Sequence, residues 1–263
     1  MLKRYKKYSF LFQELVHRDF TKKYKRTALG IGWSVLSPLL QLLVMKIMLT
    51  KFFATGIEHY TTFLFAGNIV FNYYNESTSS GMTALAENSA IISKVNVPKY
   101  MFVFSKNISS LISFLLTVVV FFVLAGLGGI EFTWKITMLI FPIVCLVLFN
   151  IGLGLVLSAC YTFFRDLQYL YSIFTFLLMY MSAVFYDISA YSDFAQKLFL
   201  LNPIYLFIRY FRKIVMEQTI PTIWFHLLMI LDVCIVMIGG FYMYKKYNHD
   251  FLLFLKNRSS RGL

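Results

Sequence analysis

Four cations near the N-terminus are the residues best placed for binding chemistry. They recur at helical spacing: Arg18, Lys22, Lys25 and Arg26. Apolar residues at i, i+4 spacing occupy the other side of the same stretch: Phe12, Val16, Phe20 and Tyr24. Such a segment is typical of a helix in a membrane interface, with its apolar side in the acyl boundary and its cations among anionic headgroups. The sequence therefore predicts an N-terminal amphipathic interface helix within residues 1–30.

The composition indicates a protein that crosses a membrane several times. The chain is 59% hydrophobic and only 14% charged, with 19% aromatic residues. A soluble domain could not bury that much apolar surface, whereas lipid can cover it. The net charge of +13 is concentrated beside the apolar segments. We therefore expect anionic lipid, and not nucleic acid, as the partner of these cations.

Enzymatic motifs are missing from the sequence. His17-Arg18-Asp19 matches a catalytic triplet of protein kinases, but no glycine-rich loop and no metal-binding DFG accompany it. No phosphate-binding loop and no G-x-S-x-G occur, and no pair of the three cysteines has metal-ligand spacing. We predict no catalytic residues, no metal site and no ATP hydrolysis by this chain. An intramembrane enzyme stays as an alternative.

Six apolar segments are predicted to span the membrane as helices: 31–53, 61–82, 101–127, 136–163, 167–186 and 223–244. The second half of the second segment, NESTSSG, is small and polar, which permits close helix packing in lipid. With six spans, the N-terminus and the basic tail share one side, and nine Lys and Arg residues precede position 27 there. The positive-inside rule makes that side cytoplasmic, with both termini inside.

The stretch LFLLNPIYLFI, before the last span, is apolar but too short to cross a bilayer. Pro203 lies near its middle, after Asn202. We interpret this stretch as part of a re-entrant hairpin on the outer side. The whole chain, 1–263, is then one all-α transmembrane domain. Its parts are an interface helix (1–30), spans one to five (31–186), the re-entrant segment (187–221), span six (222–244) and a cytoplasmic tail (245–263).

Three ionisable residues lie well inside predicted spans: Lys46, Glu76 and Asp232. Such residues normally face a bundle interior or a water path, and an ion pair that only holds helices together is the alternative. At about 1.5 Å per residue, Lys46 and Asp232 lie at similar depths below the outer face. Depth therefore predicts a pair between Lys46 and Asp232, unless Lys46 lines a translocation path.

Aromatic residues are abundant in the first, second and fifth predicted spans. Those that we consider for a path are Trp33, Phe52, Tyr73, Tyr169, Phe176 and Tyr180. Packing and interfacial belts explain most aromatics in membrane proteins. A pore for sugars would also use them, because pyranose rings stack on aromatic faces. Composition leaves both interpretations open.

Four stretches, in the right order and at the right topological places, carry a family resemblance. They are LVHRDFTKKYKRTALGIGWSVLSPLL, ENSAIISKVNVPKYM, FFRDLQYL and LNPIYLFIRYFR. With them the chain resembles the permease subunits of ABC-2-type polysaccharide exporters, which move O-antigen, teichoic acid or rhamnose-rich polymers. It departs from the family at Ser182-Ala183, where members often have Ser-Pro, and at Phe71, where many have Trp.

The resemblance implies a homodimeric channel in a bacterial cytoplasmic membrane, with each copy docked on a separate ATPase that binds ATP and Mg. This chain would need no cofactor. The basic helix would be a gate for a lipid-linked polysaccharide, whose diphosphate suits its cations. Residues 86–97 would form the coupling helix, with these residues toward the ATPase: Glu87, Asn88, Ser89, Ile91, Ile92 and Lys94. Spans one and five would line the path, and the 188–210 hairpin would shape its outer mouth. An ABC-2 exporter of a drug or lipid is the alternative.

Overall fold

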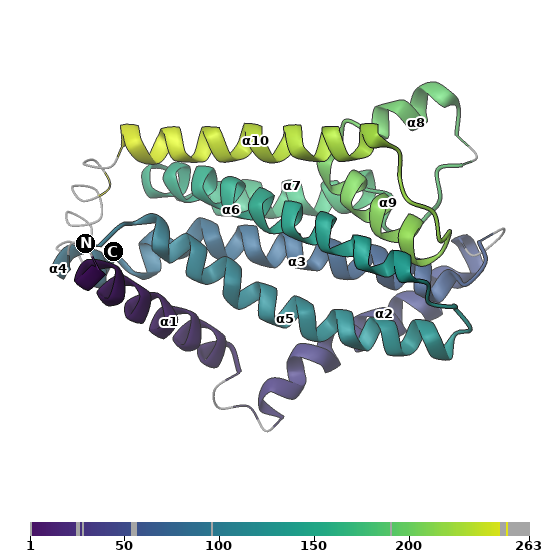
Figure 1. The fold of residues 1–263 in the computed structure, drawn as a ribbon, viewed down its shortest axis with the longest axis horizontal. Coiled ribbons are helices and arrows are strands. Elements are labelled where there is room, and N and C mark those ends of the chain that lie inside the picture. Colours follow the sequence, from purple (N-terminus) through teal and green to yellow (C-terminus); the bar gives the residue numbers. More distant parts are fainter. Residues whose placement is uncertain are drawn as a thin grey trace.

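The computed structural model describes residues 2–24, 27, 29–53, 57–95, 97–189, 191–247 and 251, with side chains from Tyr8 onward except Tyr24. Within these residues the chain is all helical (Figure 1). The helices are α1 Leu2–Tyr24, α2 Trp33–Phe53, α3 Tyr60–Glu87, α4 Ser89–Lys94, α5 Tyr100–Leu127, α6 Ile140–Phe163, α7 Leu167–Met181, α8 Asp193–Phe199, α9 Pro203–Val215 and α10 Ile223–Lys246. Two short 3₁₀ turns, Gly30–Gly32 and Trp134–Leu139, precede α2 and α6.

A helix forms at each of the six predicted apolar segments. Four helical stretches in the described residues are long and apolar enough to cross a membrane: Gly30–Phe53, Tyr100–Leu127, Trp134–Phe163 and Ile223–Lys246. The fifth predicted segment is shorter than expected, because α7 ends at Met181. The second predicted segment forms α3, a continuous helix of 28 residues. Its apolar run is interrupted by the polar NESTSSG stretch.

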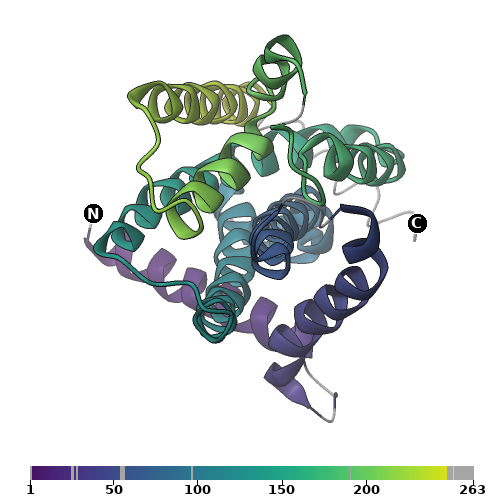
Figure 2. The ribbon, with the colours of Figure 1, turned by 90° about the vertical axis from the view of Figure 1, so that its right-hand side faces the viewer.

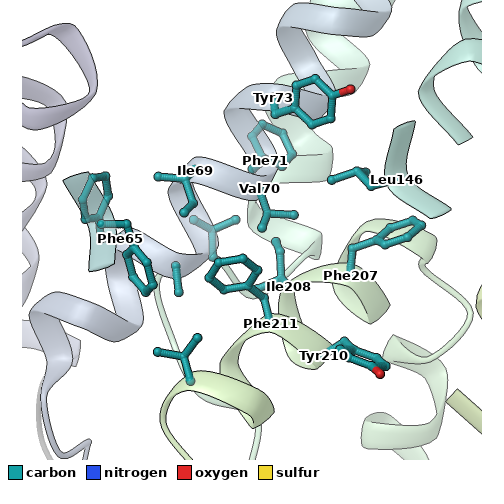
Figure 3. Close-up of a cluster of buried hydrophobic side chains, with 14 of the residues drawn as sticks. Phe65, Ile69, Val70, Phe71, Tyr73, Leu146, Phe207, Ile208, Tyr210 and Phe211 are labelled. Carbon is teal, nitrogen blue, oxygen red and sulfur yellow. The ribbon is translucent and has the colours of Figure 1, made fainter. Parts of the chain in front are cut away.

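Helix α3 is the central helix of the bundle (Figure 2). It packs against α2, α5, α6, α7 and α9. Its first half meets α9 in a cluster of large side chains (Figure 3): Phe65, Ile69, Val70 and Phe71 from α3, and Phe207, Ile208 and Phe211 from α9. Its polar half packs closely as the small residues predict, since a Cβ on Gly81 would lie 3.3 Å from the Cα of Gly154 in α6.

The two ends of the bundle differ. The start of α1, the short α4 and the end of α10 lie at one end, and α8 lies at the other (Figure 1). The first helix therefore begins, and the last helix ends, at the same end of the bundle.

The stretch LFLLNPIYLFI is not one apolar segment with a central proline, as the sequence analysis assumed. Helix α8 ends at Phe199, and α9 begins at Pro203. The Asn202 side chain caps α9 by accepting from the Ile204 N–H at 3.0 Å, and its amide donates to the Met181 carbonyl at 3.1 Å. Proline is tolerated at the first helical position because its missing N–H has no partner there. The residues therefore form two helices, and α9 packs into the bundle.

Helices α6 and α10 make the closest crossing, at two glycines. A Cβ on Gly152 would lie 2.8 Å from the Met237 nitrogen, and a Cβ on Gly240 would lie 2.8 Å from the Gly152 carbonyl oxygen. Both neighbours are backbone atoms and cannot rotate away. The crossing therefore requires glycine at both positions.

We expect Gly152→Ala to destabilise the fold by about 1–3 kcal/mol, the usual cost of overpacking a well-packed site. The measurement is the temperature at which detergent-solubilised protein loses its monodisperse size-exclusion peak. Gly239→Ala is the matched control, because the nearest atom to its Cβ is 4.0 Å away. Equal melting temperatures for the two variants would contradict this packing.

Candidate functional site

The predicted amphipathic helix exists as α1, which packs along the first half of α5 (Figure 1). Leu15 and Asp19 are its buried side chains. Lys22 is exposed, as the prediction of a cationic face requires. Lys25 and Arg26 lie outside the described residues. The burial of Asp19 was not predicted. Its contacts with Ser105 and Lys106 hold α1 against α5.

Asp19 is the centre of an ion network that joins three helices. Arg18 lies 2.8 Å from the Asp19 carboxylate, and the Ser105 hydroxyl of α5 donates to it at 3.3 Å. Lys106, also on α5, lies 3.7 Å from Asp19 and 2.9 Å from Glu87 at the end of α3. The network fixes α1 to α5 and α3 at the end of the bundle that carries α4.

Arg18 also reaches the residue before α4. Its guanidinium donates to the Asn88 side-chain oxygen at 2.8 Å, and the Asn88 amide donates to the Ala84 carbonyl at 2.8 Å. One predicted gate cation is thus bonded to one predicted coupling residue. A second coupling residue, Glu87, joins the same network through Lys106.

Helix α4 presents a different face from the one that the sequence analysis assigned to the ATPase. Ile92 is buried in a cluster with Leu15 and Phe102, and Ile91 packs against the same cluster. The predicted role of Ile92 as an intermolecular anchor is therefore wrong, because this chain already covers its side chain. The exposed residues of α4 are Ala90, Ser93 and Lys94, while Ser89 is half-buried.

Glu76 pairs with the interface helix, and the predicted Lys46–Asp232 pair is not formed. Lys23 lies 2.7 Å from Glu76 and also donates to Ser113. Lys46 is on α2, which packs on α3 and α5, whereas Asp232 is on α10, which packs on α6 and α9. No ion pair joins Lys46 to Asp232 within the described residues. Equal depth did not bring them together, because they lie on different sides of the bundle.

Five of the six predicted path aromatics are exposed on this single chain: Trp33, Phe52, Tyr169, Phe176 and Tyr180. They belong to α2 and α7, which both flank α3 (Figure 2). Tyr73 is different. Its ring stacks on Phe114 at 4.6 Å between centroids, and its hydroxyl donates to Asn107 at 3.0 Å, so it is buried and fastens α3 to α5.

A cavity of about 420 Å³ lies between α3 and α7, and polar groups in its lining alternate with apolar side chains such as Phe71, Met82 and Met179. Its lining combines hydroxyls and amides with aromatic rings: Asn75, Ser79, Thr83, Gln168, Tyr171, Ser172, Thr175 and Phe176. The Tyr171 hydroxyl donates to Thr78 at 2.6 Å. The exposed aromatics of α7 therefore adjoin hydrogen-bonding groups, a combination that suits a hydroxylated and uncharged ligand.

Arg212 is a buried cation that the sequence analysis missed. It is 3% exposed and donates to three backbone carbonyls: Phe63 at 3.2 Å, Ala183 at 2.8 Å and Val184 at 2.7 Å. Its guanidinium also lies 3.4 Å from the centre of the Phe63 ring. Gly67 makes the room, since a Cβ there would lie 2.6 Å from the Arg212 Nη2. We call this contact the Arg212 clamp.

The clamp holds a turn at which the chain departs from the resembled family. Ala183 has φ +50°, a left-handed conformation that proline cannot adopt because its ring fixes φ near −65°. Such a conformation costs roughly 1–2 kcal/mol for a residue with a Cβ. The two hydrogen bonds from Arg212 to the Ala183 and Val184 carbonyls offset that cost.

Comparison with known proteins places the chain among membrane transport subunits. It is 28% identical over 218 residues to the O-antigen export system permease protein RfbA of Myxococcus xanthus, covering 81% of this chain and 83% of that protein. A protein of the same name from Klebsiella pneumoniae is 25% identical, covering 88% and 90%. The capsule polysaccharide export inner-membrane protein CtrC of Neisseria meningitidis is 24% identical, covering 65% and 66%. The sequence profile of the ABC-2 type transporter matches residues 10–216, and the chain therefore belongs to the ABC-2 type transporter family.

Proposed function

We propose that this chain is the channel-forming permease subunit of an ATP-driven exporter of a lipid-linked cell-surface polysaccharide. The relatives support this function, because their names specify O-antigen and capsule polysaccharide export. The observation that carries it is the cavity between α3 and α7, whose lining combines hydroxyl and amide groups with Tyr171 and the exposed Phe176 of α7. A drug or a plain lipid would not need so many hydroxyl and amide groups along the same surface.

In this proposal the two flanking helices line the path in a homodimer, and each copy docks on one ATPase subunit that binds ATP and Mg. Substrate anions approach the exposed cationic face of α1. Asn202 and Pro203, at the start of α9, shape the outer mouth. The protein resides in the cytoplasmic membrane of a bacterium.

The test is reconstitution with a partner ATPase and a lipid-linked glycan. We expect ATP hydrolysis only when both subunits are present, and glycan transfer only with ATP. Hydrolysis by the permease alone would favour an intramembrane enzyme. Efflux of a hydrophobic drug without glycan transfer would favour the alternative ABC-2 exporter and overturn the proposal.

We further propose six membrane crossings, by α2, α3, α5, α6, α7 and α10, with both termini cytoplasmic and the α8–α9 segment re-entrant from the outside. Loop charges support this topology. In a variant without Cys145, Cys160 and Cys234, a cysteine at position 193 is expected to react with an impermeant reagent in whole cells. A cysteine at position 250 is expected to react only after lysis. The reverse pattern would exclude six crossings.

We propose that the exposed face of α4 contacts the ATPase subunit. Lys94→Glu is expected to reduce ATPase association and export severalfold without changing protein abundance, because exposed charges at an interface rim act mainly on association. Ile92→Asp is expected to reduce abundance instead, since its side chain is buried within this chain. Coprecipitation with the ATPase, normalised to folded permease, separates the two effects. Normal association of Lys94→Glu would remove α4 from the interface.

A further inference from the structure

A second cavity borders α3 on the side of α2 and α5, and it shares Asn75 with the α7 cavity. Its volume is about 500 Å³, within the range of about 300–1,000 Å³ found for small-molecule sites. It is enclosed by the end of α1, the first half of α2, and facing parts of α3 and α5. We call it the elbow cavity, because both α1 and α2 contribute to its lining and the two helices lie at an angle to each other (Figure 1).

The lining of the elbow cavity is rich in hydroxyl and amide groups. These are Thr27, Ser34, Ser37 and Gln41 on the α1–α2 side, and Asn72, Asn75, Ser110, Ser113 and Thr117 on α3 and α5. Trp33 adds an indole ring that is 39% exposed. Polar groups on membrane-spanning helices are costly, and they are usually retained for a function.

Several of these groups have hydrogen-bonding capacity that the described residues do not use. The Asn72 amide donates to the Gln41 oxygen at 3.0 Å, which leaves the Asn72 oxygen and the Gln41 nitrogen unused. The Asn75 oxygen accepts from Ser79, which leaves its nitrogen unused. The Ser37 hydroxyl makes no hydrogen bond within the described part of the chain. Lipid tails cannot satisfy such groups, so a polar occupant must.

The charge of the cavity selects the class of occupant. The two ionic residues of its described lining, Lys23 and Glu76, pair with each other at 2.7 Å. The charges of the described lining therefore balance, which does not favour a phosphate or a carboxylate. Unused amide donors and acceptors beside an aromatic ring suit a neutral ring that carries hydroxyls, because the hydroxyls bond the amides and the C–H face covers the indole.

We infer that the elbow cavity binds the neutral sugar ring of a membrane-anchored glycolipid. The lipid tail stays in the bilayer while the ring enters beside Trp33 and Ser37, which lie on the exposed side of α2. The cavity differs from the cationic face of α1, which suits anions. Only the view that this glycolipid is the export substrate rests on the proposed function. A resident membrane glycolipid would present the same chemistry.

The test uses the full chain in phosphatidylcholine nanodiscs, with Trp134→Phe and Trp224→Phe so that Trp33 alone reports. Monoglucosyldiacylglycerol is expected to give a saturable change in Trp33 fluorescence. Diacylglycerol, which lacks the ring, and phosphatidylglycerol, which is anionic, are expected to give none. Equal responses to all three lipids, or no saturation with the glycolipid, would mean that the cavity holds only water or lipid and would overturn the inference.

Variants then place the binding site. Gln41→Leu and Asn72→Leu are each expected to weaken glycolipid binding at least tenfold. Ser37→Phe should do the same by filling the cavity from the exposed side of α2, without removing a hydrogen bond of the fold. Gln13→Leu is the matched control, because it removes an exposed amide of α1 that lines neither cavity. Unchanged binding in the first three variants would overturn the site.

The reconstituted export assay identifies the source of the ring. If Gln41→Leu loses both glycolipid binding and glycan export, the cavity takes the export substrate. If it loses binding but exports normally, the cavity takes a resident glycolipid. Export by the wild-type protein without any glycolipid binding would overturn the inference and leave the proposed function intact.

Discussion

Arg212→Met is expected to destabilise the folded chain by at least about 3 kcal/mol. The substitution leaves the buried Ala183 and Val184 carbonyls without a donor, and an unsatisfied buried group costs about 1–3 kcal/mol. The Phe63 carbonyl keeps its donor within α3 and loses only the second bond from Arg212. The stacking contact on Phe63 is lost as well. The left-handed Ala183 then has no hydrogen bonds from the side chain that holds it. We therefore expect most of the Arg212→Met protein to be unfolded.

Reversible unfolding in mixed detergent micelles measures the change. The matched control is Arg209→Met, three residues earlier on the same helix. Arg209 pairs with Glu217 in a half-exposed position, and such a pair is worth about 0–1 kcal/mol. Gly67→Ala should reproduce part of the Arg212 effect by pushing the guanidinium away. If the two arginine variants unfold alike, the clamp does not stabilise the fold.

Lys106→Met is expected to release α1 from the bundle. Lys106 is the only cation that contacts both Asp19 and Glu87 within the described residues, and its side chain is 12% exposed. Breaking a buried ion pair by removing one partner costs about 3–5 kcal/mol. We expect less, about 1–3 kcal/mol, because Arg18 remains beside Asp19 and the Glu87 side chain is 41% exposed.

Hydrogen exchange over residues 8–24 reports the release, because a detached helix loses protection while the rest of the bundle keeps it. Lys22→Met is the control, since Lys22 is exposed and makes no ion pair in the described residues. An Asp19→Asn, Lys106→Met double variant should recover part of the loss, because the buried negative charge is also removed. Additive losses would show that the two residues act separately.

The sequence predicted the helices of this fold better than their contacts. The lengths of the apolar runs located six helices. A long run in lipid must satisfy its backbone hydrogen bonds internally, and a helix does so. The basic face of α1 was also readable from spacing. Asp19 was not, because a single acid in a basic stretch gives no periodic signal. Its role depends on Ser105 and Lys106, far along the chain.

The errors have a common physical cause. Lys46 and Asp232 were paired by depth, but depth does not specify the direction in which a side chain points around a helix. Ile92 was predicted to be an anchor because aliphatic side chains carry most of the energy of a helix bound in a groove, yet it is buried in a cluster of this chain that includes Leu15 and Phe102. Arg212 has no acidic partner to suggest its burial, and its acceptors are backbone carbonyls, which every residue has. Only tertiary structure identifies them.

The Arg212 clamp also has a consequence for how the protein is made. Arg212 and its acceptor at Phe63 are 149 residues apart in the sequence. At about 5–20 residues per second, the ribosome needs roughly 7–30 s to supply the arginine after Phe63 has been synthesised. During that interval the face of α3 that α9 later covers must lie against lipid or the insertion machinery. A nascent chain arrested before residue 203 should therefore be recognised by membrane quality-control proteases as unfinished, although its first five apolar helices are already present.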